Sequence, residues 1–103
     1  MSRPKKCRCI NCLPSTSYFT PSGVSLQNLE EVLLSLDEFE SIRLADYVGL
    51  YHEEAAMMMS ISRATFGRIL DNARCKVADA ITNGKALKIA ICNNTNKERE
   101  VDQ

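Results

Sequence analysis

The stretch that decides the fold is LYHEEAAMMMSISRATFGRIL, which spans residues 50–70. Its apolar pattern predicts two short helices joined by a tight turn. Ile61 lies in the turn, and Ser62 stands where its hydroxyl can cap the second helix. Apolar residues at helical spacing form the inner faces, namely Ala55, Ala56 and Met59 in the first helix and Phe66, Ile69 and Leu70 in the second.

The opposite face of the second helix carries Arg63, Ala64, Gly67 and Arg68. Two arginines among small residues suit close approach to a base-pair edge. A helical hairpin that merely completes a small core would show the same alternation of faces. We favour a DNA-binding helix-turn-helix because three features fall where this motif needs them: a small residue where the helices cross, an apolar residue in the turn and a cap. These are Ala56, Ile61 and Ser62.

The composition is that of an ordinary globular protein. The chain has 103 residues, 45% of them hydrophobic and 25% charged, which predicts one domain with a modest core. No apolar run approaches the length of a membrane span, and the basic start at Arg3–Arg8 leads into cysteines rather than an apolar signal segment. We therefore expect a cytoplasmic protein with no membrane partner.

The formal net charge is zero, but the charges are segregated along the chain. Residues 3–8 carry four positive charges and no negative ones. The charged residues of 26–54 are acidic except for Arg43, and those of 62–88 are again mainly basic. This distribution predicts one surface that attracts phosphate and one that repels it. We expect the acidic block to be a solvated face.

Residues 1–25 are expected to form an irregular, basic, cysteine-containing arm, residues 26–92 the helix-turn-helix domain and residues 93–103 a polar tail. Leu26–Leu34 fits either a helix or a short strand. A capping box at Ser35–Glu38 predicts a supporting helix that runs to about Tyr47 and ends at Gly49. Its expected buried residues are Phe39, Ile42 and Leu44 or Ala45.

The second helix of the motif is expected to continue to Asn83, with Gly84 ending it. Its far half lies beyond the DNA groove, so Arg74 and Lys76 are expected to meet flanking phosphate or solvent. The buried stripe is expected to be Phe66, Ile69, Ala73, Val77, Ala80 and Ile81.

Alternation in Leu87, Ile89 and Ile91 predicts a short strand near the end of the chain. A lone strand is unstable, so its partner is either Tyr18–Phe19, which would dock on the core, or a second subunit. The predicted fold class is mainly α, a three-helix helix-turn-helix with an irregular N-terminal arm and a short C-terminal strand.

Six segments spread over nearly the whole chain carry a family resemblance: RPKKC (Arg3–Cys7), LDEFESIRLAD (Leu36–Asp46), EEAA (Glu53–Ala56), SRATFGRIL (Ser62–Leu70), KVADAI (Lys76–Ile81) and GKALKI (Gly84–Ile89). Together they resemble the UPF0251 (DUF134) family of small prokaryotic predicted DNA-binding proteins, whose helix-turn-helix is similar to the fourth region of sigma factors. The resemblance implies a DNA-binding transcriptional regulator, with no known operator or ligand.

Three positions depart from the pattern of the family and of most helix-turn-helix proteins. Ser60 occupies the turn position of a glycine, and a positive φ there would cost serine on the order of 1 kcal/mol. Tyr51 replaces the small hydroxyl residue that usually caps the first helix. Gly67 lies inside the recognition helix, at a cost of roughly 1 kcal/mol relative to alanine. We therefore assign no base contact to Gly67.

Cys7, Cys9 and Cys12 form a C-x-C-x₂-C pattern beside the basic arm. Three thiolates and a fourth ligand could hold zinc or an iron–sulfur cluster. A second cysteine pair is missing, because neither Cys75 nor Cys92 has a nearby companion, and Cys75 is expected to be buried beside the apolar stripe. We favour reduced, incidental thiols and no cofactor, and keep metal or redox sensing as the alternative.

The remaining polar residues do not suggest catalysis. His52 is the sole histidine and is expected at the surface, and one of Met57–Met59 is expected in the core. No phosphate-binding glycine loop and no nucleophile–base pair is visible. We expect a protein that is not an enzyme.

The favoured function is a sequence-specific binder of double-stranded DNA that acts as a homodimer and regulates transcription. Arg63 is the candidate for a guanine edge, and the arm adds phosphate or minor-groove contacts. The alternative is a protein-interaction module that binds RNA polymerase or another protein through the acidic block. The predicted DNA-contacting residues are Ser62, Arg63, Ala64, Thr65, Arg68, Arg3, Lys5 and Lys6.

Overall fold

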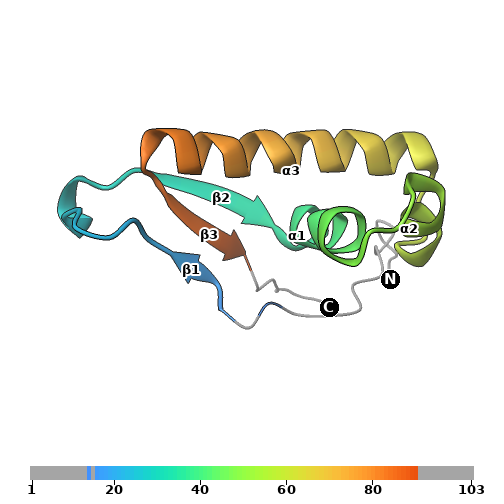
Figure 1. Ribbon diagram of the computed structural model, residues 1–103, viewed down its shortest axis with the longest axis horizontal. Helices are drawn as coiled ribbons and strands as arrows, with labels where there is room; N and C mark the ends of the chain where they lie inside the picture. Colours follow the sequence, from blue (N-terminus) through green and yellow to red (C-terminus); the bar gives the residue numbers. More distant parts are fainter. Residues whose placement is uncertain (1–13, 15, 91–103) are drawn as a thin grey trace, which may run out of the picture.

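The computed structural model describes residue 14 and residues 16–90. It is mostly helical, with a long helix lying along a small sheet and two shorter helices at one end (Figure 1). The elements are β1 (Tyr18–Phe19), the 3₁₀ turn η1 (Leu26–Asn28), β2 (Glu31–Ser35), α1 (Leu36–Ile42), its π-helical continuation η2 (Arg43–Val48), α2 (His52–Met58), α3 (Arg63–Asn83) and β3 (Ala86–Ala90).

The sheet has the order β1-β3-β2, with β3 in the centre. β2 runs parallel to β3 and pairs Val32 with Leu87, while β1 runs antiparallel and pairs Tyr18 with Lys88. The expected partner of the last strand, Tyr18–Phe19, is therefore confirmed. The predicted three helices and mostly helical content are confirmed, but the fold is mixed α/β, because residues 31–35 and 18–19 add two strands to the predicted one.

The sheet is buried on the face that meets α3. Val32 and Leu34 alternate with exposed residues along β2, and Leu33 remains 55% exposed on the opposite face. Leu34 and Ile89 pack with Ala73 of α3 in one buried cluster. Leu33 and Leu34 are adjacent in the sequence, so the alternation of buried and exposed residues along β2 is not visible as alternation of apolar and polar residues. For this reason residues 26–34 were also compatible with a helix.

The predicted capping box is present at the start of α1. The Glu38 N–H donates to Ser35 Oγ at 3.3 Å, and the Ser35 N–H donates to Glu38 Oε1 at 2.9 Å. Gly49 ends η2 in the left-handed region with φ 91°, as expected of a helix-terminating glycine. The supporting helix is thus confirmed at both ends, with Leu44 as its fully buried apolar residue and Phe39 and Ile42 half-buried.

A second buried cluster joins η2, α2 and the first turns of α3. Ile61 of the turn and Leu50 pack against it from outside. The predicted plug and inner faces are confirmed, except that Ile69 is only half-buried. The members of the cluster are Leu44, Ala55, Ala56, Met59, Phe66 and Leu70.

The second half of α3 packs the predicted stripe inward with the exception of Ile81. Spacings of three and four residues lead from Ala73 through Val77 to Ala80, and this stripe leaves Ile81 76% exposed. Cys75 is also exposed, so its predicted burial is wrong. Both residues lie off the stripe because 100° of rotation per residue carries them away from the sheet.

The acidic block is not a uniformly solvated face. Glu38 is 9% exposed and Glu40 is fully buried, where Glu40 accepts hydrogen bonds of 2.8 and 2.9 Å from Arg43. A buried carboxylate needs such a partner because removal from water is costly. No helix in the described part of the chain is long and apolar enough to cross a membrane.

Ser60 adopts φ 59° in the turn between α2 and α3, the left-handed conformation that favours glycine. We predict that Ser60→Gly raises the free energy of unfolding by about 1 kcal/mol, because glycine avoids the clash of Cβ with the backbone. Urea titration followed by circular dichroism measures this difference. Ser60→Val is the matched control, and it should lower the free energy of unfolding because a β-branched residue is disfavoured at positive φ. If Ser60→Gly were less stable than the unmodified protein, the backbone at this position would not be strained.

Candidate nucleic-acid interface

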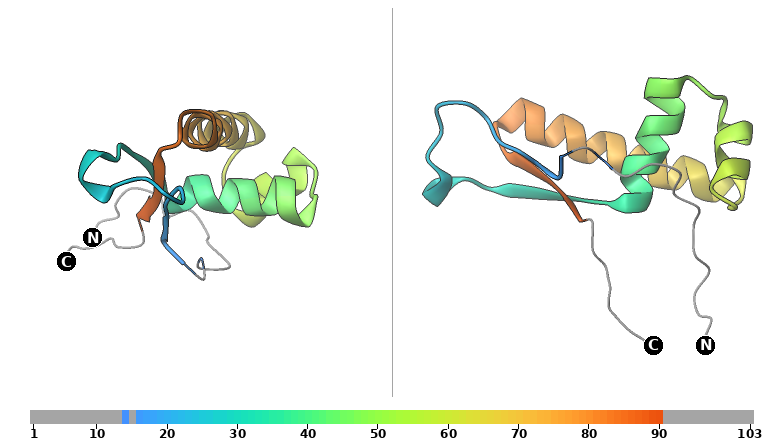
Figure 2. Two further views of the ribbon diagram at one scale, coloured as in Figure 1. Left: turned by 60° about the vertical axis from the view of Figure 1, so that its left-hand side comes forward. Right: turned by 90° about the horizontal axis from the view of Figure 1, so that it is seen from below.

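α2 and the start of α3 are joined by a tight turn at the end of the molecule away from the sheet (Figures 1 and 2). The Ile61 N–H donates to the Ala56 carbonyl at 3.1 Å, and the Ser60 N–H donates to the Met57 carbonyl at 3.1 Å. Met59 is fully buried beneath the turn, as one of the three methionines was expected to be. The turn is therefore fixed by its own backbone and by the core below it.

Ser62 is the N-cap of α3, as predicted. Its Oγ accepts from the Thr65 N–H at 3.1 Å and donates to Thr65 Oγ1 at 3.0 Å. The Arg68 Nη2 group donates to the same Thr65 oxygen at 3.3 Å. Three of the predicted contact residues are thus linked in one exposed network, which orients the Arg68 guanidinium along the first two turns of the helix.

Arg63 and Ala64 are exposed beside this network, and Gly67 is half-buried. Arg63 forms no ion pair within the described residues and lines a shallow hollow of about 600 Å³ beside the start of α2. A Cβ added at Gly67 would meet no atom within 4 Å, so packing does not require a glycine there. On the outward face of α3, the two arginines therefore stand beside two small residues, Ala64 and Gly67.

The basic residues of the second half of α3 are neutralised by acids of other elements. Arg74 donates to Asp46 of η2 at 2.6 and 3.1 Å, and Lys76 forms an ion pair with Glu38 of α1 at 2.8 Å. Both side chains remain partly in solvent, as expected, with Arg74 48% and Lys76 39% exposed, but the ion pairs with Asp46 and Glu38 were not predicted. These pairs tie α3 to α1 and η2, which the sequence pattern alone did not indicate.

Lys85, which follows the end of α3, is also neutralised by acids. Lys85 lies 3.1 Å from Asp79 and 3.4 Å from Glu30. Hydrogen bonds from Asn83 and Lys85 lower the pKa of Asp79, and the Asp79 carboxylate raises the pKa of Lys85. The positive charge of this helix is thus concentrated, for the described residues, at Arg63 and Arg68.

The start of α2 departs from the usual pattern as predicted, because Tyr51 makes no capping hydrogen bond through its side chain. His52 is half-buried rather than fully at the surface. Its ring meets Phe66 edge-on with centroids 5.3 Å apart. This contact packs the first turn of α2 against α3 and accounts for the histidine without a ligand role.

The basic arm and the cysteine triad lie outside the described residues, so the predictions for Arg3, Lys5 and Lys6 stay predictions. The same holds for a metal at Cys7, Cys9 and Cys12. Within residues 14 and 16–90, no group of three or more histidine, cysteine or acidic side chains is placed to hold a metal ion.

The fold and this surface define a small α/β protein that presents one basic helix start. Residues 1–96 match the family model described as "Protein of unknown function DUF134". The chain belongs to this family, as the resemblance implied. No solved structure gives a significant match.

Curated relatives carry the name UPF0251 protein. One from Chlorobium chlorochromatii is 50% identical over an alignment of 103 residues. The alignment covers 94% of this chain and 58% of the relative. One from Thermoanaerobacter pseudethanolicus is 51% identical over 89 residues, or 86% of this chain and 75% of the relative. One from Moorella thermoacetica is 52% identical over 89 residues, or 86% of this chain and 60% of the relative. The chain therefore spans less than two thirds of the first and third of these relatives.

The Asp46–Arg74 pair generates a pH-dependent stability. Hydrogen bonds from Arg74 hold the pKa of Asp46 below its ordinary value of 3.8. Because the folded pKa is lowered, the stabilisation is present above pH 3.8 and is lost as pH falls through the folded value.

We predict that Asp46→Asn lowers the free energy of unfolding. The difference from the unmodified protein should be independent of pH near neutrality and should become smaller below pH 3.8. Urea titrations at a series of pH values measure it. Glu54→Gln is the control, since this exposed acid of α2 has no ion pair within the described residues. A difference that persists unchanged at acid pH would show that Asp46 acts through packing instead.

Proposed function

We propose that this protein binds double-stranded DNA in a sequence-specific manner and regulates transcription. The single observation that carries the proposal is the exposed start of α3, where Arg63 and Arg68 are the basic residues that no acid of the described chain neutralises. A helix of this diameter enters a major groove, and arginine suits the two acceptors of a guanine edge.

The geometry around the helix supports this assignment. Phe66 and Leu70 anchor α3 in the core, which leaves the opposite side of its first two turns to solvent. Ala64 and Gly67 keep that side low enough for a base edge to approach. The neutralised far half of α3 then limits attraction to one end of the helix, so that DNA docks in one orientation.

The proposal also includes the N-terminal arm, dimerisation and the N-terminal cysteines. The arm at Arg3–Arg8 contributes phosphate or minor-groove contacts, as basic arms do in other DNA-binding proteins. Binding as a homodimer follows because one helix contacts too few base pairs for selectivity. We further propose a cytoplasmic protein without enzymatic activity or an obligatory cofactor, in which the N-terminal cysteines remain reduced.

A second candidate function is supported by exposed apolar residues. Tyr47 is 85% exposed and Tyr51 82%, and Val48 between them is 49% exposed. Exposed aromatic residues of this kind are typical of protein interfaces. In this alternative the segment that joins η2 to α2 binds a protein such as RNA polymerase, and the start of α3 has no DNA partner.

Selection of bound duplexes from a random pool separates the two functions. DNA binding predicts an enriched motif, and a dimer predicts two half-sites about one helical turn apart. It also predicts that affinity for random duplex falls steeply with salt, because bound phosphates release counterions. No enriched motif, together with weak and salt-insensitive binding, would favour the protein-interaction module.

We predict that Arg63→Ala costs about 1–3 kcal/mol on the selected site and much less on random duplex, because a lost guanine contact removes discrimination. Fluorescence anisotropy on both duplexes measures the two affinities. The matched control is Lys88→Ala, which removes an exposed base of β3 outside this surface. Equal losses on both duplexes would make Arg63 a phosphate contact.

The double substitution of Lys5→Ala with Lys6→Ala is expected to act differently. Phosphate contacts carry no sequence information, so affinity should fall by a similar factor on the selected site and on random duplex. The slope of log K against log salt should flatten by about 1–2 units. An unchanged slope in the titration would exclude the arm from the complex.

A further inference from the structure

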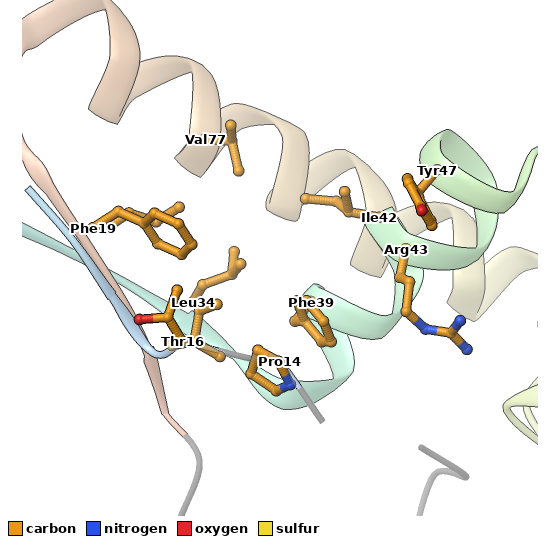
Figure 3. Close-up of a pocket in the computed structure, with 11 residues that line it drawn as sticks. Pro14, Thr16, Phe19, Leu34, Phe39, Ile42, Arg43, Tyr47 and Val77 are labelled. Carbon is orange, nitrogen blue, oxygen red and sulfur yellow. The ribbon is translucent and has the colours of Figure 1, made fainter. Parts of the chain in front are cut away.

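An apolar cavity of about 490 Å³ lies between α1, α3 and the sheet. Figure 3 shows the rings of Phe19 and Phe39 on two sides of it and Val77 of α3 on a third. Leu34 and Ile42 complete the walls, and the guanidinium of Arg43 points away from the centre. Val77, the residue of α3 that lines the cavity, lies fourteen residues after Arg63, so the cavity is separate from the proposed DNA-binding surface.

The cavity marks a core that the described residues leave incomplete. Leu34, Ala73 and Ile89 form its buried centre. Phe39 and Leu87, which pack against this centre, are only partly buried because their remaining surface faces the cavity. Apolar surface of this kind is stabilised by any apolar group that displaces water from it.

The chain itself passes along the mouth of the cavity. Pro14 and Thr16 line it, and the Ile89 N–H donates to the Ser17 carbonyl at 2.7 Å. Ser17 is therefore tied to β3 beside the cavity, and the described part of the chain begins at Pro14, in the wall of the cavity. Because Pro14 lines the cavity, the residue bonded to its nitrogen, Leu13, is joined to the chain at the cavity wall.

The residues directly before Pro14 suit that position. Leu13 is adjacent to it, and Ile10 is the next large aliphatic residue. Proline biases its predecessor towards extended or polyproline II backbone. If residues 10–13 adopt polyproline II, with three residues per turn and a rise of about 3.1 Å per residue, Ile10 and Leu13 would lie on one side of the segment, about 9 Å apart.

We propose that the cavity is filled by the chain's own segment 10–13, with Leu13 between Phe19 and Phe39 and Ile10 towards the rim. The segment completes the core that Leu34, Ala73 and Ile89 begin. It also places Cys12, the neighbour of Leu13, beside α1. This is an intramolecular docking site and does not depend on DNA binding.

Nuclear Overhauser effects in the unmodified full chain test the proposal directly. We expect contacts between the Leu13 methyl groups and the ring protons of Phe19 and Phe39. Their absence in the assigned spectrum would overturn the proposal. Contacts seen only between differently labelled chains in a mixed sample would overturn it too, because a second copy would then supply the occupant.

Two variants give an independent measurement. Leu13→Asp should lower the midpoint of thermal unfolding by at least about 5 °C, whereas Met57→Asp, at a 75% exposed position of α2, should leave it nearly unchanged. Leu13→Asp should also increase the fluorescence of added anilinonaphthalene sulfonate, since the vacated cavity can take this apolar probe. Equal probe binding by the unmodified chain and Leu13→Asp would show that the segment does not occupy the cavity.

Discussion

The packing of one face of α3 holds the two ends of this protein together. Phe66 and Leu70 are fully buried against α2 and η2, and Ala73, one turn further, is fully buried against the sheet. At about 1.5 Å per residue, the 21 residues of α3 span roughly 32 Å. A single rigid element thus sets the position of the turn relative to the strands, because each end contributes to a different cluster.

Ion pairs add a second, weaker constraint between the same elements. Asp46 and Glu38 lie on η2 and α1, and each binds a base of α3. Such half-exposed pairs stabilise a fold only modestly. Their larger effect is on the electrostatic potential, because they cancel the charge of the far half of α3 and leave Arg63 and Arg68 at its start.

Local signals made much of the fold predictable from the sequence. The capping box at Ser35, the cap at Ser62 and the ends at Gly49 and Gly84 depend only on residues within one or two turns, and all four are present. The positive φ of Ser60 follows from the geometry of a tight turn in the same way. The helix starts and stops, and with them the exposed face of the candidate site, could therefore be read from neighbouring residues.

Contacts between distant residues could not be derived in this way. β2 and β3 pair across more than fifty residues, and β2 contains neighbouring leucines that mask its alternation. Apolar periodicity also gives no information on buried acids, so Glu38 and Glu40 were assigned to a solvated face. For the same reason the sequence indicated Arg74 and Lys76 as charges near DNA, although their partners lie 28 and 38 residues away.

The continuity of α3 also links the cavity to the proposed DNA-binding surface. Val77 lines the cavity, and Ser62 begins the helix fifteen residues earlier, at a distance of roughly 22 Å. A straight helix that is packed at both ends transmits a shift in one cluster to the other, because close-packed interiors deform little. In the proposed arrangement, the segment that fills the cavity beside Val77 would add packing to the same helix that carries Arg63 and Arg68 at its start.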